Sequence, residues 1–173
     1  ILASPAADLQ VLRLHGSQQQ ALAQLLLDGH GAALGYAHYL QVMQQQRPSV
    51  ETADQPSAWL HWARQVLAAF EQFQLLCALR QGPWGVEGLN TQIAAALLQR
   101  GLLDSDQGWY EGRPVMVTRN DYNLGLMNGD IGIALCMPDS TTPSRQVLRV
   151  VFPRNDGQQG LRLVLPSRLS AVE

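Results

Sequence analysis

The sequence contains no lysine, and all twelve of its basic residues are arginine. A G-x-x-x-x-G-K-[ST] phosphate loop needs its lysine to reach the phosphates, so a complete loop of this type is impossible here. The G-x-S-x-G and H-E-x-x-H patterns are also absent, which excludes the signatures of a nucleophile-elbow hydrolase and of a zinc protease. No pair of acidic residues in a strand context suits a magnesium ion.

Cysteine and histidine are too scattered for a zinc site, because no pair among the two cysteines and four histidines has ligand spacing. Cys77 and Cys136 lie in apolar, strand-like runs, which favours buried free thiols in a reducing cytoplasm and leaves a disulfide open. No run approaches the ~18 apolar residues of a membrane span. The chain starts at Ile1 without a methionine or a signal peptide, which predicts a piece excised from a longer protein.

What the sequence does contain is enough apolar surface to fold, since 46% of its 173 residues are hydrophobic and 15% are charged. That length fits one domain, or one domain with a small appendage. The net charge of −2 argues against a stand-alone binder of polyanions. The charge is uneven, because residues 1–108 carry five arginines against eight acidic residues and residues 109–173 carry seven against six. Arginine suits phosphate contacts, and a compositional bias is the alternative explanation.

Apolar periodicity divides the first part of the chain into one strand and three helices. Alternation over Leu9–Leu14 predicts the strand. The predicted helices span Gln18–Leu27 with Ser17 as N-cap, Ala32–Gln46, and Ser57–Phe70 with Ser57 as N-cap. One face of the last helix carries an apolar stripe, which predicts core packing rather than a platform for stacked bases: Trp59, Trp62, Val66 and Phe70.

The run Phe73–Leu79 is apolar except for Gln74, which predicts a buried strand of a parallel sheet. Arg80 follows at its carboxyl end, where ligands bind in open α/β sheets. A turn and then a helix over Glu87–Arg100 complete a strand–loop–helix unit. Arg80 is therefore a candidate contact for a phosphate group, and the alternative is an exposed arginine paired with Glu87.

After Trp109 the sequence changes to short strands separated by turns, which predicts a small barrel or sheet. The chain is therefore expected to divide into an α/β part over residues 1–110 and a small β part over residues 111–173. The predicted strands are Val115–Thr118, Gly132–Met137, Gln146–Phe152 and Leu161–Leu165, with a short closing turn at Pro166–Leu169.

The stretch Gly112–Gly132 joins a predicted strand to a polar loop and ends on Asn128-Gly129-Asp130, a strong signal for a tight turn. Arginine, asparagine and tyrosine beside a strand edge suit single-stranded nucleic acid, through phosphate hydrogen bonds and stacking. The alternative is an ordinary hairpin with a solvated turn. The candidate DNA contacts are Arg119, Asn120, Tyr122 and Asn128, with Arg168 either a further phosphate contact or a side chain that merely covers the base of the barrel.

Two stretches resemble RecD-type DNA helicases, the alpha subunits of exodeoxyribonuclease V: Gly112–Gly132, reading GRPVMVTRNDYNLGLMNGDIG, and Phe73–Asn90, reading FQLLCALRQGPWGVEGLN. The resemblance implies that residues 1–110 are part of the second RecA-like (P-loop NTPase-type) motor domain, with a helical insertion. It implies that residues 111–173 are an inserted Src-homology-3-like β-barrel. It also implies that Arg80 contacts the γ-phosphate of ATP, with Gln74 and Gly82 shaping the loop. The first seventy residues match the family only loosely.

The resemblance implies a parent protein that moves 5′ to 3′ on single-stranded DNA as an ATP-dependent helicase in recombinational repair of double-strand breaks. Its partners would be the DNA and the RecB and RecC subunits, and the parent would use ATP and Mg²⁺. Because the phosphate loop is absent, the fragment alone is expected to bind neither and to be inactive. Two alternatives stay open: a stand-alone RecD-like helicase without RecB and RecC, and a non-enzymatic α/β adaptor that binds a protein or peptide.

Overall fold

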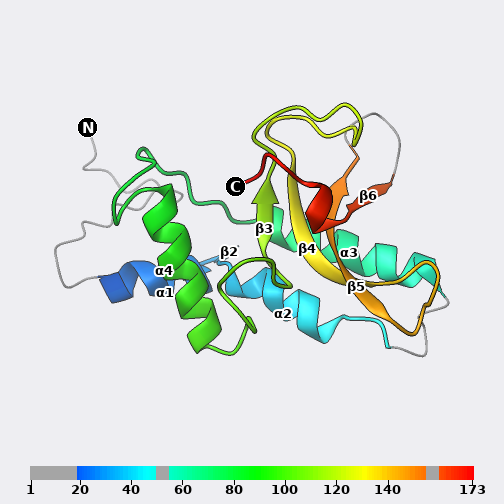
Figure 1. The fold of residues 1–173 in the computed structure, drawn as a ribbon. Helices are drawn as coiled ribbons and strands as arrows, with labels where there is room; N and C mark the ends of the chain where they lie inside the picture. Colours follow the sequence, from blue (N-terminus) through cyan, green and yellow to red (C-terminus); the bar gives the residue numbers. More distant parts are fainter. Residues whose placement is uncertain (1–18, 50–54, 155–159) are drawn as a thin grey trace.

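The computed structural model describes residues 19–49, 55–154 and 160–173, and it contains both helices and sheet (Figure 1). This mixture confirms the predicted α/β class. The predicted strand at Leu9–Leu14 and the Ser17 cap lie outside the described residues. The elements in chain order are α1 Gln19–Asp28, β1 Gly29–His30, β2 Ala33–Leu34, α2 Ala37–Gln45, α3 Pro56–Glu71, α4 Val86–Gln99, β3 Pro114–Met116, β4 Ile131–Pro138, β5 Gln146–Pro153, β6 Leu161–Val164 and the 3-10 helix η2 Pro166–Arg168.

The helices follow the predicted periodicity but differ at their starts. α2 begins at Ala37 rather than Ala32, because β1 and β2 form a two-residue antiparallel ribbon just before it. α3 begins at Pro56, so Ser57 lies within the first turn and is not the N-cap. Proline suits the first turn, because its missing N–H would have no partner within the helix and its φ is already near the helical value. None of the helices in the described ranges has the length and apolar character that crossing a membrane requires.

The two tryptophans of α3 lie at the centre of the main core. Trp59 and Trp62 are 2% and 1% exposed, and their rings meet edge to face with centroids 5.6 Å apart. The indole N–H of Trp62 donates to the carbonyl oxygen of Met43 in α2 at 3.0 Å, which fixes the two helices against each other. The apolar stripe is therefore core packing, as predicted, and its buried rings cannot stack on bases.

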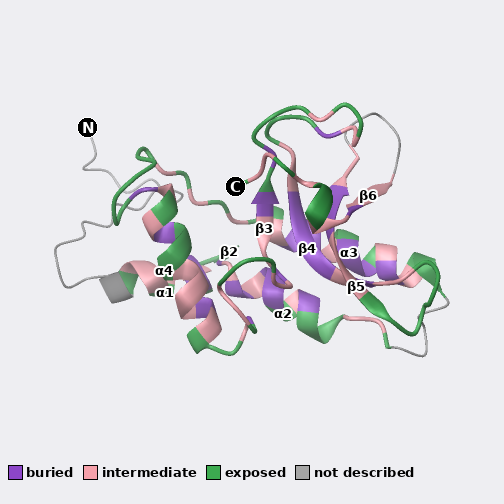
Figure 2. Cartoon of the chain, in the orientation of Figure 1, coloured by how far each residue is buried: buried purple, intermediate pink, exposed green. Residues whose placement is uncertain are grey.

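The larger sheet has the strand order β3-β4-β5-β6, and every neighbouring pair is antiparallel. Its strands begin and end within two residues of the predicted ones. Side chains alternate between the two faces along each strand. Ile133, Leu135 and Val151 pack against the helices, whereas Ala134 and Phe152 face a second, smaller core on the other side. Figure 2 shows β4 as buried along most of its length.

The sheet curls back on itself after β6. Residues 166–168 form η2, and the segment that follows returns to the free edge of β3. There the Met116 N–H donates to the Glu173 carbonyl oxygen at 3.0 Å, and the Thr118 N–H donates to the Ala171 carbonyl oxygen at 2.9 Å. The strands after Trp109 thus form a curled antiparallel sheet with a short turn before its last segment.

The predicted buried strand at Phe73–Leu79 is wrong for the described chain. The segment is extended but belongs to neither sheet, and Leu76 and Leu79 are 89% and 60% exposed. A strand needs hydrogen bonds to a neighbouring strand, and neither antiparallel sheet of the described residues supplies one. Only the inner side of the segment is covered, where the Leu75 N–H donates to the Tyr36 hydroxyl at 3.0 Å.

Both cysteines are free thiols, as expected, but each is half-buried rather than buried. Cys77 lies in the extended segment and not in a strand, whereas Cys136 lies in β4. Burial, followed by the neighbouring Glu111 carboxylate, raises the pKa of the Cys136 thiol to about 11. Its sulfur is therefore protonated and poorly reactive at neutral pH.

Candidate nucleic-acid and phosphate contacts

The loop between β3 and β4 contains the turn that the sequence predicted. The Gly129 N–H donates to the Val117 carbonyl oxygen at 2.8 Å, and the Val117 N–H donates to the Asp130 carbonyl oxygen at 2.9 Å. Two residues of one strand thus oppose one residue of the other, which is a β-bulge, and Gly129 takes the left-handed φ of +92° that this bulge type needs. The Asp130 N–H also bonds the Met127 carbonyl oxygen at 3.0 Å. The turn therefore lies at the entry to β4, not at the tip of the loop.

Polar side chains of this loop accept hydrogen bonds from its own backbone. Asn120 Oδ1 accepts the Asn128 N–H at 2.8 Å across the base of the loop. Asp121 Oδ1 accepts the N–H groups of Asn123 and Leu124 at 3.0 Å each, which is an Asx-type turn. Of the two asparagines that the sequence offered as DNA contacts, Asn120 orders the loop through its side chain and Asn128 takes part through its backbone N–H.

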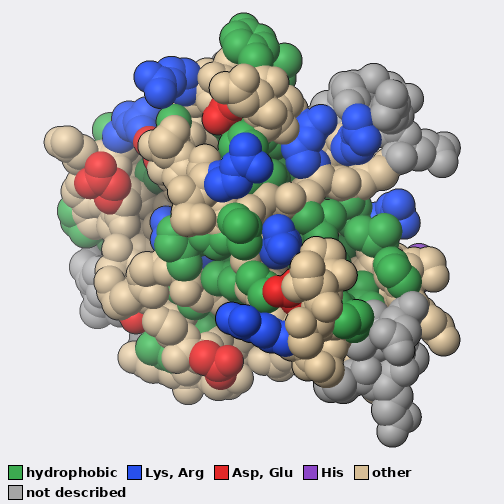
Figure 3. Space-filling model, turned by 45° about the vertical axis from the view of Figure 1, so that its right-hand side comes forward, with side chains coloured by type: hydrophobic (Ala, Val, Ile, Leu, Met, Phe, Trp, Pro, Cys, Tyr) green, Lys and Arg blue, Asp and Glu red, His purple; other side chains and the backbone are tan. Residues whose placement is uncertain are grey.

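Arg119 and Tyr122 stand out from this ordered loop. Tyr122 is 77% exposed and Arg119 is exposed as well. The Tyr122 hydroxyl accepts a hydrogen bond from Asn120 Nδ2 at 3.2 Å, which ties the ring to the base of the loop. Figure 3 shows a hydrophobic group projecting at the top of the molecule, with arginine side chains gathered below it. An exposed aromatic ring near cationic side chains is the combination that binds unpaired bases and their phosphates.

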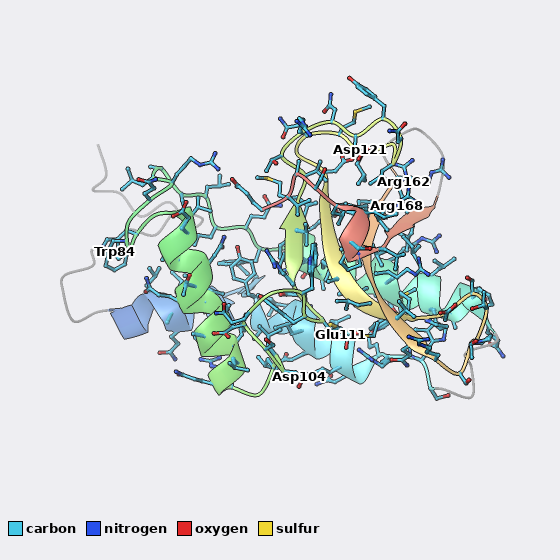
Figure 4. All side chains as sticks on the ribbon, in the orientation of Figure 1. Trp84, Asp104, Glu111, Asp121, Arg162 and Arg168 are labelled. Atoms are coloured by element: carbon cyan, nitrogen blue, oxygen red, sulfur yellow. The ribbon has the colours of Figure 1, made fainter. Side chains whose placement is uncertain are left out.

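Arg168 lies on η2, close to the same loop. Leu169, the next residue, lines a small hollow together with Arg119, Asn120 and Asp121. The hollow has a volume of about 30 Å³, which is room for no more than a few water molecules. It is too small for a base, so a base would have to lie on the surface of the loop. Figure 4 shows Arg168 and Asp121 at this end of the sheet.

Arg80 stands at the turn before α4, a helix that starts within one residue of its predicted start. Its side chain is 76% exposed and pairs with the Glu173 carboxylate, not with the carboxylate of Glu87. Glu87 donates only its backbone N–H, to the Arg80 carbonyl oxygen at 3.2 Å. Carboxylate and phosphate groups each present two oxygen atoms that can accept hydrogen bonds from a guanidinium group. Arg80 is therefore placed to bind an anionic oxygen at the surface.

The two residues expected to shape the Arg80 loop lie in different settings. Gly82 has a φ of +87°, which glycine adopts without a steric cost, and its carbonyl oxygen accepts the Gly85 N–H at 3.1 Å. Gly82 thus forms the turn after Arg80. Gln74 is exposed on the extended segment, and within the described residues no hydrogen bond joins its side chain to this turn.

Sequence reasoning missed a network that joins the segment after α2 to the sheet. Arg47 forms an ion pair with Glu111 at 2.5 Å and lies over the Trp62 ring, 5.2 Å from its centroid. Glu111 also accepts the Cys136 N–H at 2.7 Å. A cavity of about 280 Å³ borders this network, and Asp104 lines it together with Glu111 (Figure 4). The partners are distant in the sequence and follow no local pattern, so no sequence signal could have found them.

Proteins similar to parts of this chain are named RecBCD enzyme subunit RecD. The protein of Haemophilus influenzae is 38% identical over 99 residues, which are 56% of this chain and 16% of the relative. The protein of Mycolicibacterium smegmatis is 43% identical over 76 residues, 44% of this chain and 14% of the relative. The protein of Mycobacterium tuberculosis is 43% identical over 107 residues, 62% of this chain and 17% of the relative. No protein-family model matches the chain.

The chain spans about a sixth of the length of the curated relatives it matches, which share between 14% and 17% of their own length with it. The two motifs and the comparisons point to the same group of proteins. The resemblance to RecD-type proteins is therefore confirmed for about half of the chain.

Proposed function

We propose that this RecD-like chain is part of an ATP-dependent DNA helicase subunit of a RecBCD-type exodeoxyribonuclease V, which unwinds DNA 5′ to 3′ during double-strand-break repair. The observation that carries the proposal is the 38% and 43% identity to RecD subunits over about half of the chain. Residues 1–110 would form part of the second RecA-like motor domain with a helical insertion. Residues 111–173 would form the inserted Src-homology-3-like barrel. The parent would act in the cytoplasm with RecB, RecC and single-stranded DNA.

Two structural features support this division into motor and barrel. The curled antiparallel sheet, with η2 before the segment that returns to β3, suits a small barrel. The extended segment, Arg80 and α4 follow one another as the strand, loop and helix of an α/β unit do. Leu76 and Leu79 expose apolar surface that the helices on the faces of a parallel sheet would cover in a complete motor domain.

ATP and Mg²⁺ would be bound by the parent, and this chain would contribute an arginine. Arg80 already engages a carboxylate, and the oxygens of a γ-phosphate would take its place and be stabilised by the positive charge. Within the described ranges, no three His, Cys, Asp or Glu side chains gather into a group that could hold a metal ion by themselves. Without a phosphate-loop lysine, the chain alone would not hydrolyse ATP.

On the DNA side, the β3–β4 loop would contact a single strand. Tyr122 would stack on a base, and Arg119 and Arg168 would contact phosphates. Asn120 and Asn128 would hold the loop and offer their amide groups to the strand. Contacts of this kind release counterions, so the affinity for DNA would fall steeply as the salt concentration rises.

Unwinding by the longer protein that carries this sequence tests the proposal. We expect ATP-dependent unwinding of a duplex with a 5′ single-stranded tail and none of a duplex with only a 3′ tail. Weak DNA binding that does not respond to salt, without DNA-stimulated ATP hydrolysis, would contradict the proposal and favour a non-enzymatic adaptor. Copurification with RecB and RecC would distinguish a complex subunit from a stand-alone helicase.

A further inference from the structure

The end of the sheet that carries the Tyr122 loop also contains Arg162, a residue that the sequence did not single out. Arg162 lies on β6 directly opposite Phe152 of β5. Directly opposed residues share a face of the sheet, so Arg162 projects on the side of the smaller core, where Phe152 packs. Its half-buried side chain donates through Nη1 to the carbonyl oxygen of Gly125. Figure 4 shows Arg162 just below the loop that carries Asp121.

Gly125 fits closely against this guanidinium. Its φ of +62° is a left-handed conformation, which glycine adopts at no steric cost. A Cβ atom added to Gly125 would lie 2.8 Å from Arg162 Nη2 and 2.9 Å from Arg162 Cζ. The guanidinium therefore lies against the bare backbone of the loop, and a side chain at this position would displace it.

Gly125 in turn connects Arg162 to Tyr122. The Gly125 N–H donates to the Tyr122 carbonyl oxygen at 3.3 Å and closes the turn at the tip of the loop. A chain of two hydrogen bonds thus runs from β6 through Gly125 to the residue whose ring is 77% exposed. A charged side chain from a different strand thus bonds the turn that also carries the exposed ring.

We propose that Arg162 is a positioning residue for single-strand binding, which holds the turn that presents Tyr122 to an unpaired base. This inference rests on the proposed function of the β3–β4 loop. Stacking on a ring that is already held in place avoids part of the cost of ordering the loop on binding. Arginine suits the task, because its planar group carries several donors and stays charged at all accessible pH values. Arg162 acts through Gly125 and makes no DNA phosphate contact of its own.

The test measures the affinity of the full-length protein for a fluorescein-labelled oligothymidine. Removal of a stacked aromatic ring weakens binding by about tenfold, so Tyr122→Ala and Arg162→Ala should each weaken it by about that factor. The double variant should bind no more weakly than Tyr122→Ala alone, because both changes remove the same stacking contact. Arg162→Lys, which still carries a donor, should restore part of the affinity.

A direct phosphate contact would give a different result. It would make the two single effects add, and Arg162→Ala would lower the slope of affinity against salt concentration by about one ion. Additive effects or a lower salt slope would each overturn the positioning role. The role would also be wrong if Arg162→Ala binds like the unchanged protein while Tyr122→Ala binds weakly. Arg145→Ala is the matched control, because it removes the same charge from the loop at the other end of β4.

Two further measurements separate this inference from a folding defect and from failure of the proposed function. Gly125→Ala disturbs the same contact by changing the loop residue. It should lower the affinity as much as Arg162→Ala does, and the double variant should bind no more weakly than either single variant. Amide hydrogen exchange in residues 121–126 should rise in Arg162→Ala, while exchange in β4 stays unchanged. If Tyr122→Ala leaves the affinity unchanged, the proposed function of the loop fails. If, independently, amide exchange in residues 121–126 stays unchanged in Arg162→Ala, Arg162 does not hold the turn and the positioning role is wrong.

Discussion

The exposed leucines of the extended segment give a sharp test of whether the chain is part of a larger α/β domain. Leu76 is 89% exposed in the described chain, so Leu76→Ala should change its free energy of unfolding by less than about 0.5 kcal/mol. In a complete parallel sheet the same side chain would be buried. There the substitution should cost about 2–5 kcal/mol, which combines the lost transfer free energy with a cavity.

The assay compares urea unfolding of this chain with that of the longer protein, followed by tryptophan fluorescence and by proteolysis within the extended segment. Leu40→Ala is the matched control, because Leu40 is 0% exposed and already lies in the main core. It should cost about 2–5 kcal/mol in both proteins. If Leu76→Ala is as harmless in the longer protein as in this chain, the segment stays uncovered there and the proposal of a RecA-like sheet is wrong.

Three further predictions concern the buried Tyr39 hydroxyl and the half-buried Cys136 thiol. The buried Tyr39 hydroxyl donates to the Gly112 carbonyl oxygen at 2.9 Å. Tyr39→Phe should therefore lower the free energy of unfolding by about 1–3 kcal/mol in a urea titration. Tyr110→Phe is the control and should cost less, because within the described residues the Tyr110 hydroxyl makes no such bond. The Cys136 thiol has a pKa raised to about 11, so in a Cys77→Ser background iodoacetamide should alkylate it at pH 8 about 100-fold more slowly than in the unfolded chain. The stability that this raised pKa contributes should be lost as the pH rises from about 9 to about 11, because the unfolded chain then holds fewer protons than the folded one. Alkylation at the rate of an unfolded thiol, or an unchanged stability across that pH range, would contradict this description of Cys136.

Local patterns in the sequence were sufficient for most of the secondary structure. The stripe that includes Trp59 and Trp62 has helical spacing and is buried, and the short strands after Trp109 lie within two residues of their predicted positions. These features depend on neighbours in the sequence, which periodicity describes well. The glycine of the Asn128-Gly129-Asp130 turn was also predictable, because a left-handed φ favours glycine.

The failures concern contacts between distant segments. Phe73–Leu79 has the composition of a buried strand, but a strand exists only where another strand lies beside it. Arg80 pairs with Glu173, and Arg162 bonds Gly125, across long stretches of sequence. No local pattern encodes such pairs, so the sequence indicated the loop of the candidate DNA contacts but not the residue that supports it.

The most direct test of the proposed motor is ATP turnover by the longer protein carrying Arg80→Ala, measured with single-stranded DNA present. Loss of an arginine that stabilises the transferring phosphate lowers turnover by about 1,000-fold or more. We expect a loss of this size with single-strand binding largely intact. Arg100→Ala serves as the control, because Arg100 forms an exposed ion pair with Asp28 at the other end of α4. Turnover that survives Arg80→Ala unchanged would contradict the assignment of Arg80 to the ATP phosphates.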